Sequence, residues 1–259
     1  MKIQYCSDLH LEFPENQSFL KAHPLKPAGN ILILAGDVVP FVEMNKHADF
    51  FDYLADTFET TYWIPGNHEY YRSDASERSG TLNEKIRSNV VLINNQVVKV
   101  NNVRFIFTTL WSHITPVHEW KIQKNMSDFH VITYQSERLS TDNFNQLHEE
   151  CKAFLVSALQ EPDSKETIVV THHVPTLINY PQRYEESLLN EAFVVELSDL
   201  IESAEPDYWI YGHTHANTSD FEVGKTHMLT NQLGYVEYNE HLDFDIAKTI
   251  TAVKTSQAE

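Results

Sequence analysis

The chain has 259 residues, of which 42% are hydrophobic. This is enough apolar material for one large domain with a sizeable core, so we expect residues 1–259 to form a single domain. Its formal net charge is -18 and no block of lysine and arginine appears, so the composition argues against a partner made of duplex nucleic acid. No apolar run approaches membrane-spanning length, and we expect neither a signal peptide nor a membrane partner. The two cysteines form no CxxC motif and are expected to be free thiols, which favours a cytoplasmic location.

Short apolar runs rich in β-branched and aromatic residues recur along the chain and predict buried strands. In chain order they cover residues 3–6, 31–34, 62–64, 168–170 and 208–211. Three segments between them, near residues 50–58, 144–158 and 193–204, repeat apolar residues at helical spacing. Thr141 and Asp142 are candidate caps for the second helix, and Pro206 ends the third.

Two hairpins are predicted among these strand and helix units. Asn101-Asn102 separates residues 97–100 from 103–107, and Gly224-Lys225 separates residues 220–223 from 226–229. Antiparallel hairpins among such units predict an α/β fold with either one mixed sheet or two sheets packed face to face with helices outside. Residues 111–143 are the least regular part, and we interpret them as a cap or insertion over the site.

A polar cluster directly follows each of the five strands. If the strands are parallel, their carboxyl ends meet at one edge, which is where open α/β sheets place their sites. Carboxylate, amide and imidazole groups without thiolates suit Mn, Fe, Zn or Mg. The clusters are Asp8-Leu9-His10, Gly36-Asp37, Gly66-Asn67-His68-Glu69, His172-His173 and Gly212-His213-Thr214-His215.

Taken singly, these clusters have ordinary explanations. Asp8 and His10 lie two apart and so share a face of a strand, but such a pair is common. Asp37 could cap a helix, Asn67 could be a turn residue, and His213 could be an ordinary loop histidine.

The ordered set resembles the calcineurin-like metallophosphoesterase superfamily, whose pattern is D-x-H, GD, GNH(E/D), H and GHxH. The match runs from residue 8 to residue 215. The resemblance implies an αββα sandwich of two mixed β-sheets with two metal ions at the sheet edge. It also implies the ligands: Asp8, His10 and His215 for one ion, Asn67, His172 and His213 for the other, and Asp37 for both. His173 is an alternative to His172.

The resemblance further implies hydrolysis by a hydroxide that bridges the two metals. Asp37 and His68 would then be catalytic, with His68 as acid or hydrogen-bond donor near the leaving group. Glu69 either orients the His68 loop or is an exposed loop carboxylate. Substrate contacts are expected from Asn67, His68, Arg72, His173 and Trp111, and the aromatic residues of the insertion either stack on a nucleobase or pack the loop onto the body.

One departure from the family narrows the function. The sequence after Gly36-Asp37 lacks the GDxxDRG extension of protein Ser/Thr phosphatases. Near its start the chain reads Ser-Asp-Leu-His-Leu-Glu-Phe, which is similar to the corresponding segment of compact bacterial phosphohydrolases and cyclic-nucleotide phosphodiesterase relatives. We therefore predict a dinuclear-metal-dependent phosphohydrolase that cleaves a small phosphomonoester or phosphodiester, with a nucleotide among the candidate substrates. The alternatives are a catalytically silent metal-binding scaffold and a nuclease on short oligonucleotides. The oligomeric state is left open.

Overall fold

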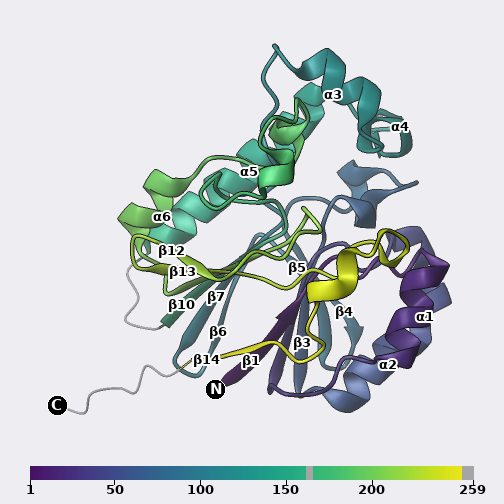
Figure 1. Ribbon diagram of the computed structural model, residues 1–259, viewed down its shortest axis with the longest axis vertical. Helices are drawn as coiled ribbons and strands as arrows, with labels where there is room; N and C mark the ends of the chain where they lie inside the picture. The colour runs from purple at the N-terminus through teal and green to yellow at the C-terminus, as the bar shows by residue number, and fades with distance from the viewer. Residues whose placement is uncertain (162–165, 253–259) are drawn as a thin grey trace.

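The computed structural model describes residues 1–161 and 166–252 and contains two six-stranded sheets (Figure 1). The first sheet has the order β14-β1-β2-β3-β5-β4, and the second has the order β12-β13-β11-β10-β7-β6. The strands of the first are β1 (Lys2–Cys6), β2 (Ile31–Ala35), β3 (Thr60–Ile64), β4 (Leu82–Arg87), β5 (Val90–Asn94) and β14 (Thr249–Thr251). Those of the second are β6 (Gln96–Val100), β7 (Val103–Thr108), β10 (Glu166–Thr171), β11 (Tyr208–Tyr211), β12 (Phe221–Val223) and β13 (Thr226–Thr230).

Both sheets are mixed, as the predicted fold class requires. The inner strands pair in parallel, whereas β14, β4, β12 and β6 at the edges pair antiparallel with their neighbours. The five apolar runs all lie in strands, and both predicted hairpins form, as β6–β7 and β12–β13. The αββα sandwich is therefore confirmed.

Alternation along the strands explains why the sheets stack. In β2, Ile31 and Ile33 face a cluster that also contains Phe105 and Phe107 of the second sheet, so this cluster lies between the sheets. Leu32 and Leu34 point to the opposite face and pack with residues of the helices outside. Each large apolar side chain buried in this way contributes about 1.5–3 kcal/mol.

Helices cover the outer face of each sheet (Figure 1). On the first sheet, Leu20 of α1 (Pro14–Ala22) and Phe51 of α2 (Ala48–Thr57) join the cluster that contains Leu32. On the second, Leu155 of α5 (Thr141–Gln160) and Ile201 of α6 (Ser198–Ala204) pack with strand residues. Within the described ranges, none of the helices is both long and apolar enough to cross a membrane.

Two helix boundaries differ from the prediction. The cap of α5 is Ser140, not Thr141 or Asp142, because the backbone of Ser140 is extended and its hydroxyl accepts from the Asn143 backbone N–H at 3.2 Å. In return, the Asn143 side-chain oxygen accepts from the Ser140 backbone N–H at 3.3 Å. Helix α6 begins only at Ser198, whose backbone N–H donates to Glu196 at 2.8 Å, so Phe193 precedes the helix.

Residues 111–143 contain short elements and pack against the amino-terminal half of α5. These are α3 (Glu119–Asn125), α4 (Asp128–Val131), β8 (Thr133–Tyr134) and β9 (Glu137–Arg138). Trp111, Ile122 and Phe129 form a separate apolar cluster with Phe144 of α5 and with Tyr70. Short 3-10 helices complete the fold at Phe41–His47, His68–Tyr70, Ala75–Glu77, Gln182–Tyr184, Asn190–Ala192, Val236–Tyr238 and Glu240–Asp243.

Candidate metal centre

The five polar clusters meet at the carboxyl ends of β1, β2, β3, β10 and β11. Five of the predicted ligands there, Asp8, His10, Asp37, His213 and His215, have φ between 47° and 80°. This left-handed region is costly for residues other than glycine, and such strain concentrates at functional sites. Gly36 and Gly66 allow the close approach, since a Cβ on either would collide with the His172 ring.

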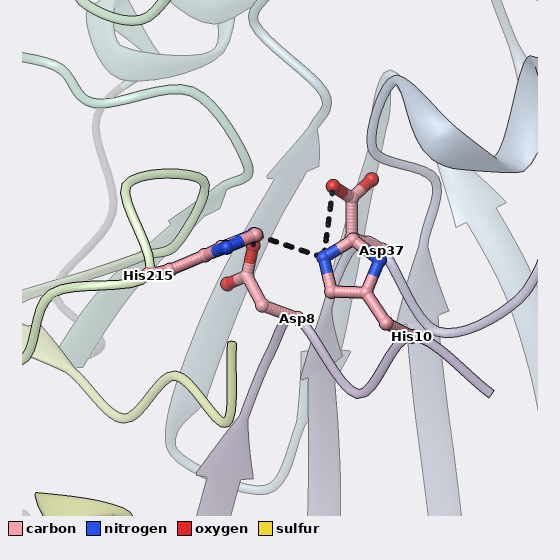
Figure 2. A group of neighbouring side chains, drawn as sticks. All are labelled: Asp8, His10, Asp37 and His215. Atoms are coloured by element: carbon pink, nitrogen blue, oxygen red, sulfur yellow. Dashed lines mark hydrogen bonds and ion pairs between the residues drawn. The ribbon is translucent and has the colours of Figure 1, made fainter. Parts of the chain in front are cut away.

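The first group of side chains that could hold a metal ion consists of Asp8, His10, Asp37 and His215 (Figure 2). The Nε2 atoms of His10 and His215 lie 2.9 Å apart. His215 Nε2 lies 3.4 Å from Asp8 Oδ1, and His10 Nε2 lies 3.7 Å from Asp37 Oδ2. The possible ligand atoms of these four residues all lie within 4.8 Å of one another, as the ligands of a single ion do.

The second group is centred on Nε2 of His172. This atom lies 3.0 Å from His213 Nδ1, 3.2 Å from Asn67 Oδ1 and 3.3 Å from Asp37 Oδ2. The same Asp37 oxygen therefore faces both groups, which is the geometry that a carboxylate bridging two ions needs.

The outer ring nitrogen of each of these histidines is held by an acceptor. His10 Nδ1 donates to Glu12 at 3.0 Å and His215 Nδ1 donates to Glu240 at 2.9 Å. His172 Nδ1 donates to the Ala35 carbonyl at 2.9 Å, and His213 Nε2 donates to the Ala192 carbonyl at 3.2 Å. Because carbonyls and carboxylates only accept, the inner nitrogens are left with free lone pairs, which suits metal ligation.

The electrostatics of the centre favour a cation. Asp8 and Asp37 are 0% and 1% exposed. Although burial raises the pKa of Asp37, the His172 imidazole outweighs it and holds that pKa well below its usual range. Burial lowers the pKa of His172, but the Asp37 carboxylate raises it to about 9, so a cation bound at Nε2 would take the place of the proton that Asp37 otherwise stabilises there. Two buried carboxylates that stay ionised attract positive charge, and the oxygen and imidazole donors fit Mn, Fe, Zn or Mg.

His68 lies beside the two predicted ligand groups and forms, with His10 and Glu12, a third group of side chains that could hold a metal ion. Its Nδ1 donates to Glu12 Oε1 at 2.9 Å, and its ring stacks on Tyr71 with centroids 4.0 Å apart. Its Nε2 lies 3.5 Å from the hydroxyl of Tyr235. The same Glu12 oxygen accepts from His10, and these two histidines outweigh the effect of burial and lower the pKa of Glu12 to about 2.

Glu69 is fully buried and ties two loops together. Its carboxylate accepts from the backbone N–H groups of Asp37 at 2.9 Å, Val38 at 2.7 Å and Gly66 at 2.6 Å, and from Trp63 Nε1 at 3.0 Å. The exposed carboxylate is therefore wrong, and these hydrogen bonds are those that the predicted orienting role requires.

A cavity of about 260 Å³ lies over the centre. The region 111–143 contributes Asn125, Met126 and Ser127 to its wall, so this segment reaches the site. The other lining residues come from the ligand loops and from two later loops: Asp37, Asn67, His68, Tyr71, Tyr184, Phe193, His213, His215, Tyr235 and Glu240.

Three expected substrate contacts lie elsewhere. Trp111 is 1% exposed and packs against Phe144 in the apolar cluster of residues 111–143. Arg72 points into an ion pair with Glu43. His173 is 0% exposed, and its ring contacts those of His213 and Trp111 rather than the cavity. Of the expected contacts, Asn67 and His68 are the ones that line the cavity.

Sequence reasoning missed the acceptors behind the ligands. Asp128 accepts from Asn67 Nδ2 at 2.9 Å and from the Tyr71 hydroxyl at 2.8 Å, which turns the Asn67 oxygen toward the centre. Glu12, two residues after His10, could have been found from its spacing. Asp128 and Glu240 carry no local signal, because they reach the site only through the tertiary fold.

Comparison with known proteins gives matches over most of the chain. The model of the calcineurin-like phosphoesterase family matches residues 1–217. Uncharacterized protein L509 of Acanthamoeba polyphaga mimivirus is 32% identical over 260 residues, which cover 90% of this chain and 91% of the relative. The crystal structure of phosphopantetheinyl hydrolase (PptH) from Mycobacterium tuberculosis has a TM-score of 0.70 at 16% identity and covers 100% of this chain and 98% of that one. A dimetal phosphatase from Danio rerio has a TM-score of 0.49 at 11% identity, covering 90% and 87%.

Proposed function

The chain belongs to the calcineurin-like phosphoesterase family and is a metal-dependent phosphoesterase, and we propose that it hydrolyses a small phosphomonoester or phosphodiester at a centre of two metal ions. The observation that carries this proposal is the position of Asp37 Oδ2, which faces both His10 Nε2 and His172 Nε2 at 3.7 Å and 3.3 Å. One carboxylate oxygen that faces two ligand groups suits a pair of bridged ions.

We assign Asp8, His10 and His215 to one ion and Asn67, His172 and His213 to the other, with Asp37 shared. The free lone pairs of the inner nitrogens support this assignment, and the donor types support Mn, Fe, Zn or Mg. When bound, such a pair of ions clamps a phosphate and lowers the pKa of a water.

His68 is assigned the transfer of a proton to the leaving oxygen. It lines the cavity, and its Nδ1 is occupied by Glu12 at 2.9 Å. Nε2 is therefore the nitrogen available to a substrate in the cavity. Stacking on Tyr71 fixes the plane of the ring.

The alternatives receive less support. A silent scaffold would usually have lost ligands, whereas every predicted ligand and His68 is present. The net charge of -18 disfavours duplex nucleic acid and weakens the case for a nuclease. A nucleotide remains a candidate substrate, since tyrosines line the cavity. The two buried free cysteines are compatible with the cytoplasmic location that we propose.

The first experiment measures hydrolysis of p-nitrophenyl phosphate and bis-p-nitrophenyl phosphate by metal-stripped protein, with and without Mn²⁺. We expect turnover that depends on added metal, and the preferred compound identifies monoester or diester chemistry. Asp37→Ala should remove both ions and the activity, whereas the control Asp49→Ala, on the exposed side of α2, should keep them. Full turnover by Asp37→Ala would contradict the bridging assignment.

A further inference from the structure

A second cavity, of about 220 Å³, adjoins the one over the metal centre. Tyr235 lines both, and its ring lies 4.8 Å from that of His10 and 4.4 Å from that of His215. The second cavity and the cavity over the metal centre therefore share the Tyr235 side chain as part of their walls. The other lining residues are Phe13, Glu15, Asn16, Glu237 and Tyr238.

Three aromatic rings form much of its wall. Phe13 stands at 82° to Tyr235 with centroids 5.2 Å apart, and Tyr238 stands at 83° to Tyr235 with centroids 6.0 Å apart. Phe13 is 37% exposed and Tyr238 is 68% exposed, so their surfaces are available to a ligand rather than used in the core. Aromatic faces attract cations through the ring quadrupole.

The charge of the wall has the matching sign. Glu15, in the first turn of α1, and Glu237, in the 3-10 helix Val236–Tyr238, are both exposed. Over residues 1–161 and 166–252, neither carboxylate has an ion-pair or hydrogen-bond partner, and no lysine or arginine lines the cavity. The second cavity is therefore negative as well as aromatic.

Asn16 holds the two sides of this cavity together. Its side-chain amide donates to the carbonyls of Leu9 at 3.0 Å and Gly234 at 2.8 Å, and its oxygen accepts from the Val236 backbone N–H at 3.2 Å. The residue is 1% exposed. The wall therefore exists before any ligand binds.

We propose that the second cavity binds an ammonium group on the alcohol part of the substrate, an inference that rests on the phosphoesterase function proposed above. The substrate class is then a phosphate ester of a short ammonium-bearing alcohol, such as choline. An anionic group would be repelled by Glu15 and Glu237, and a neutral apolar group would leave those carboxylates unused. A short linker is expected because Tyr235 lines both cavities and its ring lies 4.8 Å from that of His10.

The test compares phosphocholine with 3,3-dimethylbutyl phosphate, its neutral isostere, on the Mn²⁺-loaded protein. We expect kcat/KM for phosphocholine to be about tenfold higher, since cation–aromatic attraction is of this order. Equal values, or no hydrolysis of phosphocholine by a protein that hydrolyses p-nitrophenyl phosphate, would overturn the inference and leave the proposed function standing. Glycerophosphocholine and phosphatidylcholine vesicles, assayed side by side, distinguish a soluble ester from a lipid headgroup as the source.

Variants locate the effect in the second cavity. The double variant Glu15→Gln, Glu237→Gln should bring the ratio of the two kcat/KM values close to one, whereas the control Glu222→Gln, on the exposed edge strand β12, should keep the wild-type ratio. An unchanged ratio in the double variant would place the cation elsewhere and overturn the assignment.

A measurement of choline binding tests the second cavity without requiring turnover. Calorimetric titration with choline should give binding that Tyr238→Ala weakens by about tenfold. Absence of choline binding would overturn the inference even if every phosphate ester is hydrolysed. Conversely, choline binding by a protein that hydrolyses no ester would contradict the proposed function alone.

Discussion

The carboxylate of Glu12 joins a predicted metal ligand to the predicted acid. A single oxygen, Oε1, accepts from His10 Nδ1 at 3.0 Å and from His68 Nδ1 at 2.9 Å. At the residue scale this leaves Nε2 of His10 facing the centre. It also favours the protonated His68 ring that a proton donor needs, because the Asp37 and Glu12 carboxylates outweigh burial and raise the pKa of His68. Carboxylates that orient metal-bound histidines also raise the basicity of the ligand.

Replacing this carboxylate tests the link. Glu12→Gln keeps the size of the side chain but loses its charge, so we expect kcat to fall by about 10–100-fold, the usual cost of losing such an orienting partner. Steady-state kinetics on p-nitrophenyl phosphate provide the measurement, with the exposed Glu77→Gln as a charge-matched control. A variant with wild-type kcat would contradict the orienting role.

The proton-donor role assigned to His68 can be tested separately from the role of Glu12. His68→Ala should lower turnover of alkyl phosphates, which are poor leaving groups, by about 10²–10⁴-fold, because these need a proton. Turnover of p-nitrophenyl phosphate should fall much less, since nitrophenolate leaves without one. The ratio of the two losses is the readout, and equal losses would argue against a proton donated by His68.

At the scale of elements, the segment 111–143 supports the candidate site as well as lining its cavity. Helix α4 supplies Asp128, which is 0% exposed and accepts from Asn67 and Tyr71. Asn67 and Tyr71 flank the 3-10 helix that carries His68, so the segment braces one predicted ligand and the ring that stacks on the predicted acid.

Removing this brace should loosen the second ion. In Asp128→Ala the Asn67 amide loses its hydrogen-bond acceptor, and we expect metal content to fall at the position held by Asn67, His172 and His213. Equilibrium dialysis followed by metal analysis measures this directly. Asp128→Asn, which retains an amide oxygen as acceptor, should lose less metal, and unchanged metal content in Asp128→Ala would refute the bracing role.

At the scale of the whole molecule, buried neutral histidines limit stability in acid. His148 on α5 is 1% exposed and its Nδ1 donates to the Leu110 and Trp111 carbonyls at 3.2 and 3.1 Å. Burial lowers its pKa. In the unfolded chain the pKa of a histidine is about 6.5. As the pH falls through this value, the unfolded chain therefore binds more protons than the folded chain. Folding stability therefore decreases toward acid.

The measurement is the free energy of unfolding in urea at pH 7.5 and at pH 5.0. His148→Asn keeps a donor for the same carbonyls. Between pH 7.5 and pH 5.0 we expect this variant to lose less unfolding free energy than the wild type, by about 1 kcal/mol. Other acid-sensitive groups cancel in the difference, and the exposed His23→Asn serves as control. An equal loss in wild type and His148→Asn would show that His148 titrates normally.

The sequence by itself predicted the strands that carry the polar clusters, both hairpins, the helices α2, α5 and α6, and the order of the clusters, whereas α1, α3, α4, β4, β5, β14 and the short strands β8 and β9 were not predicted. Buried parallel strands must be apolar along their whole length, so runs such as residues 31–34 can be recognised as buried strands without any contact information. The polar groups at their ends are also local, and parallel strands bring their carboxyl ends to one edge. That is why Asp8 and Asn67, which follow β1 and β3 of the first sheet, can be grouped from the strand pattern, whereas His172, which follows β10 of the second sheet, was joined to them by the family resemblance.

Only the tertiary structure decided which groups stand behind the ligands. Glu240 reaches His215 across 25 residues and Asp128 reaches Asn67 across 61, so no spacing rule connects them. It also gave aromatic residues different surroundings: Trp111 is buried against Phe144, whereas Tyr235 lines two cavities. Periodicity reveals which face of a strand or helix is apolar. It does not reveal which distant side chain fills the space beside that face, because this depends on how the sheets, helices and loops pack together.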